Sequence, residues 1–151
     1  LKKKYGIFFQ KCFNYKFNLF NSQESPWEGT RVCRRKNLKS IDFMRQKVKS
    51  KNLKYNFFRF DKFRRIQVFE NGGWHFSYLM SEKEIQKKIK AWTHSELDTA
   101  ENSNLETIKN RVRSNKDLFG RNITLSKIEF TRSHYPEYIV DNKELFKNWI
   151  I

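Results

Sequence analysis

The spacing of apolar positions predicts strands in the first half of the chain. From Cys12 to Phe20 apolar and polar residues partly alternate, which is typical of a half-buried strand. Short strands are also expected over 31–35 and 66–69, whereas the composition of 21–30 is typical of a loop. The strand over 66–69 leads into the only Gly-Gly pair, Gly72-Gly73, which favours a turn because glycine reaches positive φ without a Cβ clash.

The clearest helix signal begins at Ser81. Ser81 and Glu84 have the spacing of a capping box, in which each side chain satisfies an unpaired amide of the first turn. An apolar stripe at helical spacing follows, made by Ile85, Ile89 and Trp92. We therefore expect a helix over about 82–93.

Two further helices are expected from capping residues. Ser40 can cap a helix over 41–49, which has apolar residues on one face. Ser103 and Glu106 form a second capping box, which predicts a helix ending near Arg113. Its inward face would consist of Leu105, Ile108 and Val112.

The C-terminal region predicts a strand over 123–130, a break at Pro136 and a last short helix capped by Asp141 and Glu144. No repeat is visible, and no linker separates regions of different composition. A length of 151 residues is within the usual range for one domain. The prediction is a single α/β domain over 1–151.

Charge divides the chain unequally. Residues 1–65 carry 19 Lys and Arg against 4 Asp and Glu, whereas residues 66–151 carry 13 against 12. Such asymmetry is typical of proteins that bind nucleic acid, anionic membranes or phosphorylated substrates. The alternative is codon bias, because Lys, Asn, Phe and Ile are all abundant, as expected from an AT-rich genome. No apolar run reaches the roughly 18–20 residues that span a bilayer.

Candidate chemistry is concentrated in the stretch from Gly72 to Leu79. His75 could ligate a divalent metal as neutral imidazole or donate a hydrogen bond to a phosphate. Trp74 and Tyr78 could stack on a sugar or a base. A single histidine beside a tryptophan can equally be a structural residue, and the spacing alone does not decide between the two.

A second candidate cluster, His94-Ser95-Glu96-Leu97-Asp98, follows the predicted helix over 82–93. A carboxylate here could act as a general base on a sugar hydroxyl. The alternative is a polar helix end with solvated acids. Arg121 is one of several basic residues that could meet a diphosphate through a bidentate guanidinium contact.

The run Gly72-Gly73-Trp74-His75-Phe76-Ser77-Tyr78-Leu79 resembles the signature of glycosyltransferase family 17, the family of the β-1,4-mannosyl-glycoprotein 4-β-N-acetylglucosaminyltransferase. The similarity continues in Trp92-Thr93-His94-Ser95-Glu96, and upstream Trp27-Glu28-Gly29-Thr30 resembles a Trp-x-Gly-Thr element of the family. In all it covers roughly residues 15–121, in the same order.

The resemblance implies the C-terminal part of a GT-A-like nucleotide-sugar transferase fold, a mixed sheet with flanking helices. It also implies transfer of N-acetylglucosamine, or a related sugar, from a UDP-sugar to a hydroxyl of a glycan or polysaccharide acceptor, with inversion. Glu96 would be the catalytic base, with Asp98 as the less favoured candidate, and His75 would bind the metal or diphosphate. The expected substrate-binding residues are Trp27, Trp74, Ser77, Tyr78, His94 and Arg121.

The implied cofactor is a divalent metal, Mn²⁺ or Mg²⁺, held mainly by an Asp-x-Asp motif that these 151 residues lack. We therefore expect a C-terminal portion that is inactive alone. Its location would be cytoplasmic or peripheral to a membrane in a bacterial or viral source, and the Golgi lumen in a eukaryotic one. Two alternatives remain: a basic, aromatic-rich nucleic-acid-binding module, or a non-catalytic glycan-binding remnant.

Overall fold

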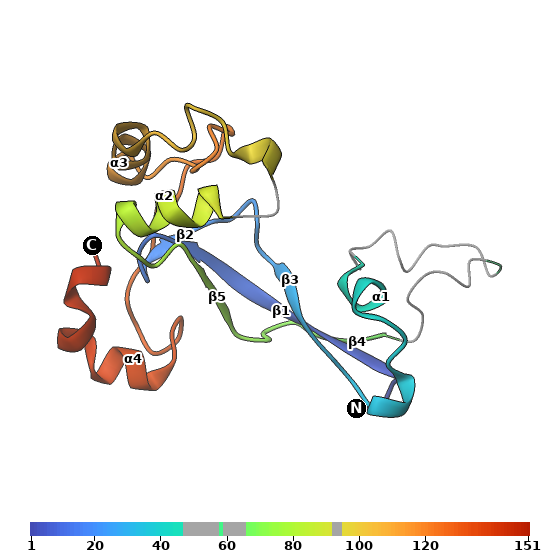
Figure 1. Cartoon of the computed structure of the whole chain (residues 1–151). Helices are drawn as coiled ribbons and strands as arrows, with labels where there is room; N and C mark the ends of the chain where they lie inside the picture. The colour runs from blue at the N-terminus through green and yellow to red at the C-terminus, as the bar shows by residue number, and fades with distance from the viewer. Residues whose placement is uncertain (47–57, 59–65, 92–94) are drawn as a thin grey trace. The chain divides into compact units, whose positions relative to one another are not determined.

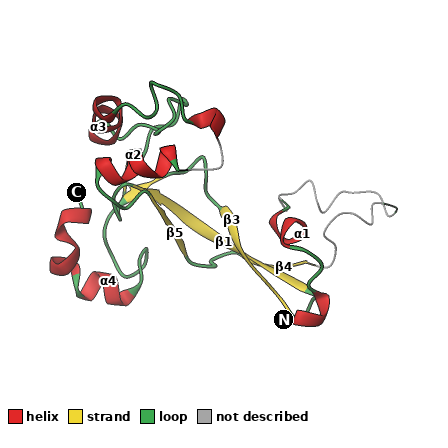
Figure 2. Ribbon diagram, in the orientation of Figure 1, coloured by secondary structure: helices red, strands yellow, loops and turns green. Residues whose placement is uncertain are grey.

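The computed structural model describes residues 1–46, 58, 66–91 and 95–151. It contains helices and a mostly antiparallel set of strands (Figures 1 and 2). The chain divides into two compact units that interleave in sequence. Unit 1 comprises Leu1–Lys11 and Ser25–Gly73, and unit 2 comprises Cys12–Glu24 and Trp74–Ile151. The expectation of a single domain stays a prediction.

The strand predicted over Cys12–Phe20 is wrong in its bounds. β1 runs over Tyr5–Asn14, the chain turns, and β2 (Leu19–Phe20) returns antiparallel to it. The turn begins at Tyr15, which has a φ of 64° and a buried ring. Its hydroxyl donates to the Lys116 carbonyl at 3.0 Å, so a contact distant in sequence favours a turn that alternation could not predict.

Unit 1 is built on the first part of β1. β3 (Trp27–Cys33) pairs with it antiparallel, and β4 (Ile66–Phe69) pairs with it parallel. The predicted strand over 66–69 is confirmed, but the predicted loop over 21–30 ends earlier, because β3 already begins at Trp27. A short 3-10 turn, η1 (Arg35–Asn37), follows β3 and replaces the end of the strand predicted over 31–35.

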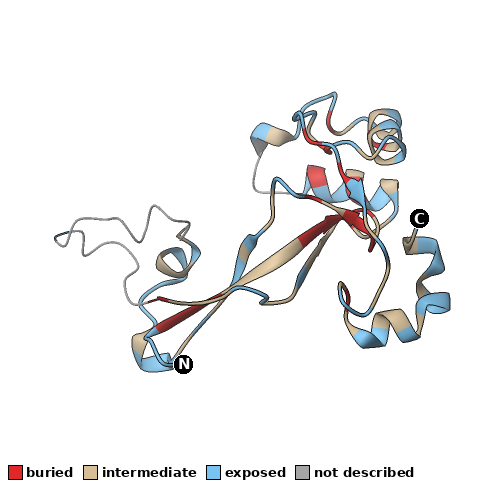
Figure 3. Ribbon diagram, turned by 180° about the vertical axis from the view of Figure 1, so that it is seen from behind, coloured by how far each residue is buried: buried red, intermediate tan, exposed pale blue. Residues whose placement is uncertain are grey.

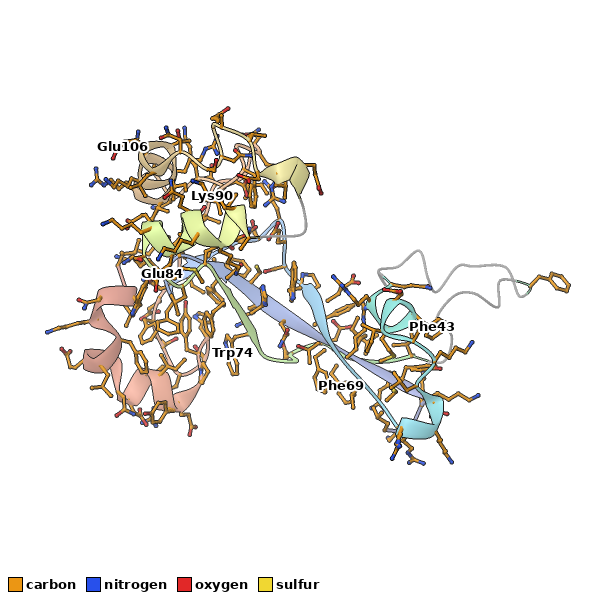
Figure 4. The ribbon with its side chains drawn as sticks, in the orientation of Figure 1. Phe43, Phe69, Trp74, Glu84, Lys90 and Glu106 are labelled. Atoms are coloured by element: carbon orange, nitrogen blue, oxygen red, sulfur yellow. The ribbon has the colours of Figure 1, made fainter. Side chains whose placement is uncertain are left out.

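Helix α1 (Ile41–Arg45) covers one face of this sheet (Figure 4). Its Ser40 cap is confirmed, since the hydroxyl accepts a hydrogen bond from the Phe43 amide at 3.0 Å. The helix ends four residues before the predicted position 49, and 47–49 lie outside the described residues. Phe43 and Met44 pack against the buried cluster of unit 1: Tyr5, Ile7 and Ile66.

Unit 2 contains β5 (Trp74–Ser77), which pairs with β1, and the two longest helices, α2 (Glu82–Lys90) and α3 (Leu105–Arg113). The capping box of α2 is confirmed, although the helix ends at Lys90 and the predicted 92–93 are not described. The second capping box is wrong by one residue. Asn104 caps α3 by accepting from the Thr107 amide, because Ser103 instead donates to the Thr99 carbonyl.

The core of unit 2 is formed by side chains of β2, α2 and α3 and of the segments that follow β1, β5 and α3 (Figure 3). It confirms an inward position for Ile108, which is fully buried, and Val112 packs at its edge. Its buried members are Tyr15, Leu19, Tyr78, Ile85, Ile89, Ile108, Leu118, Ile123 and Leu125. Three of these side chains belong to α2 and α3, and the other six come from strands, turns and loops between Tyr15 and Leu125. The core is therefore assembled from segments distant in sequence.

The last thirty residues are less regular than predicted. The strand expected over 123–130 is reduced to β6 (Ser126–Lys127), paired with β2. Helix α4 (Glu137–Asp141) follows Pro136, and the final helix is a 3-10 helix, η4 (Lys143–Trp149). Asp141 does not cap it, because that carboxylate accepts two hydrogen bonds from Arg132 at 3.1 and 2.6 Å. No helix among the described residues is both long and apolar enough to cross a membrane.

Candidate functional site

Five of the predicted site residues lie on or after two elements of unit 2: Trp74, His75 and Ser77 on β5, Tyr78 directly after it, and Arg121 in the turn that follows α3. Trp74 and His75 directly follow the Gly72-Gly73 turn. Both residues belong to a strand, since β5 pairs with β1 and the Tyr15 amide donates to the Ser77 carbonyl at 3.0 Å.

Arg121 is held by two carboxylates. One guanidinium nitrogen donates to Asp117, and another lies 2.8 Å from a carboxylate oxygen of Glu24. The Asp117 side chain is 1% exposed and also accepts from the backbone amides of Phe119 and Arg121. The Arg121 side chain is nevertheless 48% exposed, so part of its guanidinium faces solvent. Arg121 is therefore a fixed and accessible cation.

The protonation states within this pair follow from its hydrogen bonds. Burial alone would raise the pKa of Asp117, but the hydrogen bonds from the Arg121 side chain and the two backbone amides lower that pKa below its usual value. The hydrogen bond to Asp117 raises the pKa of Arg121, with a further contribution from Glu24. Both groups are charged at neutral pH, and their geometry is fixed by charge-assisted hydrogen bonds.

Tyr78 lies at the centre of this region. Its backbone has a φ of 55°, an uncommon conformation for a residue with a large side chain, and the residue is 8% exposed. The ammonium of Lys88 lies 4.6 Å from the centroid of its ring. Burial, with the charge of Glu24, raises the pKa of Tyr78 to about 12, so its hydroxyl is protonated at neutral pH.

His75 is half-buried, and the charges of Glu24 and Lys88, both in unit 2, change the pKa of its imidazole. Burial lowers the pKa of His75 below its ordinary 6.5; the carboxylate of Glu24 acts in the opposite direction, and Lys88 reinforces the lowering. The neutral imidazole is therefore favoured at pH 7, which is the form that ligates metals or accepts a hydrogen bond. We call this set of residues the acid–base cluster: Glu24, His75, Tyr78, Lys88, Asp117 and Arg121.

Sequence reasoning missed Glu24, although three residues of the acid–base cluster respond electrostatically to its charge. It lies in a stretch predicted as a loop, and no motif or periodicity marks it. Only the return of β2 beside β1 carries the following residues to their place in unit 2. Nearby Cys12 is excluded as a nucleophile at neutral pH, because burial and Glu24 raise the pKa of its thiol to about 12.

Trp74 lies on β5 (Figure 4) and is 37% exposed. Its indole N–H donates to the carbonyl of His134, which fixes the ring against the C-terminal region. The His134 ring in turn lies 3.5 Å from the Thr131 hydroxyl and 3.4 Å from the Glu129 carbonyl. A fixed, partly exposed indole is a suitable surface for stacking on a sugar ring.

The remaining predicted residues lie on other elements or outside the described residues. Glu96 lies in a short 3-10 turn, η3 (Ser95–Leu97), and Asp98 follows it; both are exposed. The carboxylate whose charge acts on His75 is Glu24. Trp27 begins β3 in unit 1 and is 36% exposed. His94 lies outside the described residues.

Whether the described residues can bind the expected divalent metal depends on how many ligand side chains lie close together. Within residues 1–46, 58, 66–91 and 95–151, no three His, Cys, Asp or Glu side chains come together in a group that could hold a metal ion. His75 and Glu24 alone are fewer donors than the near-octahedral oxygen-rich shell that Mg²⁺ requires. These residues do not fit a complete metal site, so no step below depends on a metal.

Comparisons with known proteins add no relatives: no protein-family model matches the chain, and neither the curated proteins nor the solved structures searched contain a match.

Proposed function

We propose that this chain belongs to a glycosyltransferase of the family 17 type with a GT-A-like fold. The reaction would transfer N-acetylglucosamine, or a related sugar, from a UDP-sugar to a glycan or polysaccharide hydroxyl. The observation that supports the proposal is the acid–base cluster. It gathers His75, Tyr78 and Arg121, residues of the resembling segments, around two carboxylates in one unit.

The chemistry of the acid–base cluster suits the diphosphate side of such a reaction. In an inverting transfer, the acceptor oxygen attacks the anomeric carbon, the bond from that carbon to the UDP oxygen breaks, and a carboxylate takes the hydroxyl proton. Negative charge then accumulates on the departing diphosphate. Arg121 is fixed by Asp117 and Glu24 yet 48% exposed, so a phosphate oxygen can reach its remaining donors without a rearrangement of the side chain.

The other roles follow in the proposal from chemistry and resemblance together. Trp74 would support a sugar ring, and the protonated hydroxyl of Tyr78 would donate to an oxygen acceptor. Glu96 stays the predicted base, with Asp98 second, and metal binding stays assigned to His75. Glu24 becomes an additional candidate base because its carboxylate acts on His75. In a longer transferase that supplies the Asp-x-Asp motif, loss of transfer in Glu24→Gln with retention in Glu96→Gln would assign the base to Glu24, and the reverse result to Glu96.

The proposal is tested by the binding of UDP-GlcNAc and UDP to the full chain by calorimetry, with and without Mn²⁺. Arg121→Ala should weaken UDP binding about ten- to hundred-fold, which is the usual cost of losing a hydrogen bond to a charged group. Arg132→Ala is the matched control, because Arg132 also pairs with an aspartate, Asp141, in the same unit. It should leave binding unchanged.

Absence of UDP-GlcNAc and UDP binding under both conditions would overturn the proposal. Binding of an N-glycan or polysaccharide without any binding of nucleotide would identify the non-catalytic glycan-binding alternative instead. Equal weakening by Arg121→Ala and Arg132→Ala would remove the role given to Arg121.

A further inference from the structure

Unit 1 carries a dense group of basic side chains at one end of β1. The antiparallel register pairs Tyr5 with Cys33, so the residues before β1 and the residues after β3 lie at the same end of the strand pair (Figure 1). Two hydrogen bonds join these segments: the Tyr5 hydroxyl donates to the Asn37 backbone carbonyl at 2.9 Å, and the side-chain amide of Asn37 donates to the Lys4 carbonyl at 3.5 Å. Six exposed basic residues are thereby gathered: Lys2, Lys4, Arg34, Arg35, Lys36 and Lys39.

Few acids oppose this charge. In stretches 1–4 and 34–42, Asp42 is the single carboxylate against seven Lys and Arg. The seventh cation, Lys3, donates to the Ile66 carbonyl at 3.0 Å. No carboxylate in the part of the chain that the structure describes pairs with any of the other six within 4.0 Å. All six residues are exposed, so their charges can meet an external anion.

Aliphatic side chains are exposed among these cations. Leu38 is 48% exposed and Ile41 is 66% exposed, and they flank Lys39 and Ser40 between η1 and α1. Helix α1 directs Phe43 and Met44 to the buried cluster, which leaves Ile41 of its first turn without that packing. We call Leu38, Ile41 and the six basic residues the basic aliphatic tip.

The composition of the basic aliphatic tip distinguishes between two kinds of polyanion. Single-stranded nucleic acids are bound by cations together with aromatic rings on which bases stack. Among the described aromatic rings beside the tip, Tyr5 is 7% exposed, and the Phe43 ring packs on the buried cluster and lies 4.7 Å from the Lys39 ammonium. An anionic bilayer instead attracts clusters of four to eight Lys and Arg, and takes aliphatic side chains into its interface.

We propose that the basic aliphatic tip docks unit 1 on an anionic membrane surface. The six cations would approach lipid phosphates while Leu38 and Ile41 enter the headgroup and acyl boundary. The proposal rests on unit 1 alone and does not depend on the glycosyltransferase function. If both hold, the acceptor would be a glycan presented at such a surface.

The test is flotation of the full chain with vesicles of phosphatidylcholine alone and of phosphatidylcholine mixed with phosphatidylglycerol. We expect binding to the anionic vesicles only, decreasing as the salt concentration rises. The double variant Arg35→Gln, Lys36→Gln should weaken the partition by about five-fold for each charge removed. Lys83→Gln with Lys90→Gln, exposed lysines of α2 in unit 2, is the matched control and should bind as the native chain does.

Leu38→Ser with Ile41→Ser tests insertion without a change of charge. It should weaken vesicle binding by at least about ten-fold, because each methylene removed from the interface contributes favourably to partition. Circular dichroism checks that all variants fold. No binding to anionic vesicles, or equal loss in the tip and control variants, would overturn the proposal. Binding of a single-stranded RNA oligonucleotide that is stronger than vesicle binding, and insensitive to the Leu38 and Ile41 changes, would also overturn it, in favour of nucleic acid.

Discussion

At the scale of single residues, His75 lies under the influence of two opposite charges. Glu24 raises the pKa of the imidazole and Lys88 lowers it, while burial contributes the largest lowering. Because the folded pKa is below the ordinary 6.5, the folded protein binds fewer protons at this site than the unfolded chain. The free energy of unfolding should therefore decrease as the pH falls below about 6.5, because the unfolded chain then binds the proton more tightly than the folded protein does.

The titration of His75 tests this arrangement. The pKa should rise in Lys88→Gln and fall in Glu24→Gln, since each change removes one of the two opposing charges. The measurement is the pH dependence of the imidazole C2–H signal by NMR, assigned by its loss in His75→Asn. Lys83→Gln, on the same helix as Lys88, should leave the midpoint unchanged. Shifts in the same direction for the Lys88 and Glu24 variants would contradict the geometry of the acid–base cluster.

Asp117 is the second residue whose environment gives a testable pH effect. Its pKa is lowered in the folded protein by hydrogen bonds that outweigh burial, so its contribution to stability is complete above its ordinary 3.8 and is lost as the pH falls below that value. Asp117→Asn should reduce the free energy of unfolding at pH 7 by about 1–3 kcal/mol and flatten its acid dependence. Urea unfolding across this pH range measures both, and an unchanged acid slope in the variant would contradict the account.

At the scale of elements, the Gly72-Gly73 connection between β4 and β5 needs glycine for two different reasons. Gly73 has a φ of 117°, which agrees with the conformational argument made from sequence. Gly72 is required by close approach instead: a Cβ atom there would lie 2.5 Å from the Phe8 Cβ and 2.7 Å from its Cα. No pattern in the sequence identifies that contact, because Phe8 is distant along the chain.

Substitution of Gly72 by Ala should destabilise the protein by about 1–3 kcal/mol through overpacking against β1. Phe8→Ala should not rescue it, because the Phe8 Cα and Cβ atoms that block the new methyl group remain. Urea unfolding of the two single variants and the double variant measures this. Restoration of stability in the double variant would show that the ring of Phe8, rather than its backbone, limits the space.

At the scale of the whole molecule, the two units differ in the size of their buried clusters. Among the residues that the structure describes, the buried cluster of unit 2 has nine members and that of unit 1 has three. Since apolar burial is the main stabilising term in folding, unit 1 should open more readily. β1 contributes to both units, so one strand offers an internal comparison.

Amide hydrogen exchange should therefore be faster over Tyr5–Ile7 than over Cys12–Asn14. Ile7→Ala and Ile108→Ala form a matched pair, because both side chains are fully buried, one in each unit. We expect Ile7→Ala to accelerate exchange mainly in unit 1 and Ile108→Ala mainly in unit 2. Exchange at one rate along β1, with both variants affecting all segments equally, would show that the units unfold together.

Local signals in the sequence predicted the elements whose stability is local. The α2 capping box, the Ser40 cap and the strand over 66–69 are confirmed, because caps and short apolar runs depend on neighbouring residues. The predicted bounds of the first strand, the predicted end of the loop before β3 and the predicted Ser103 cap were wrong. In each, a partner distant in sequence or a competing hydrogen bond prevailed, such as Lys116 for Tyr15 and Thr99 for Ser103.

The candidate site shows the same division. The sequence by itself determined the uneven charge, the capped helix α2 and the choice of His75, Tyr78 and Arg121, because these depend on residue type and short-range spacing. Only the tertiary structure decided that Glu24 and Asp117 hold Arg121 and that Lys88 lies over Tyr78. Tertiary pairing likewise gathered the basic aliphatic tip, because β1 and β3 align segments about thirty residues apart. Electrostatic interactions depend on distance in space, which chain order does not specify.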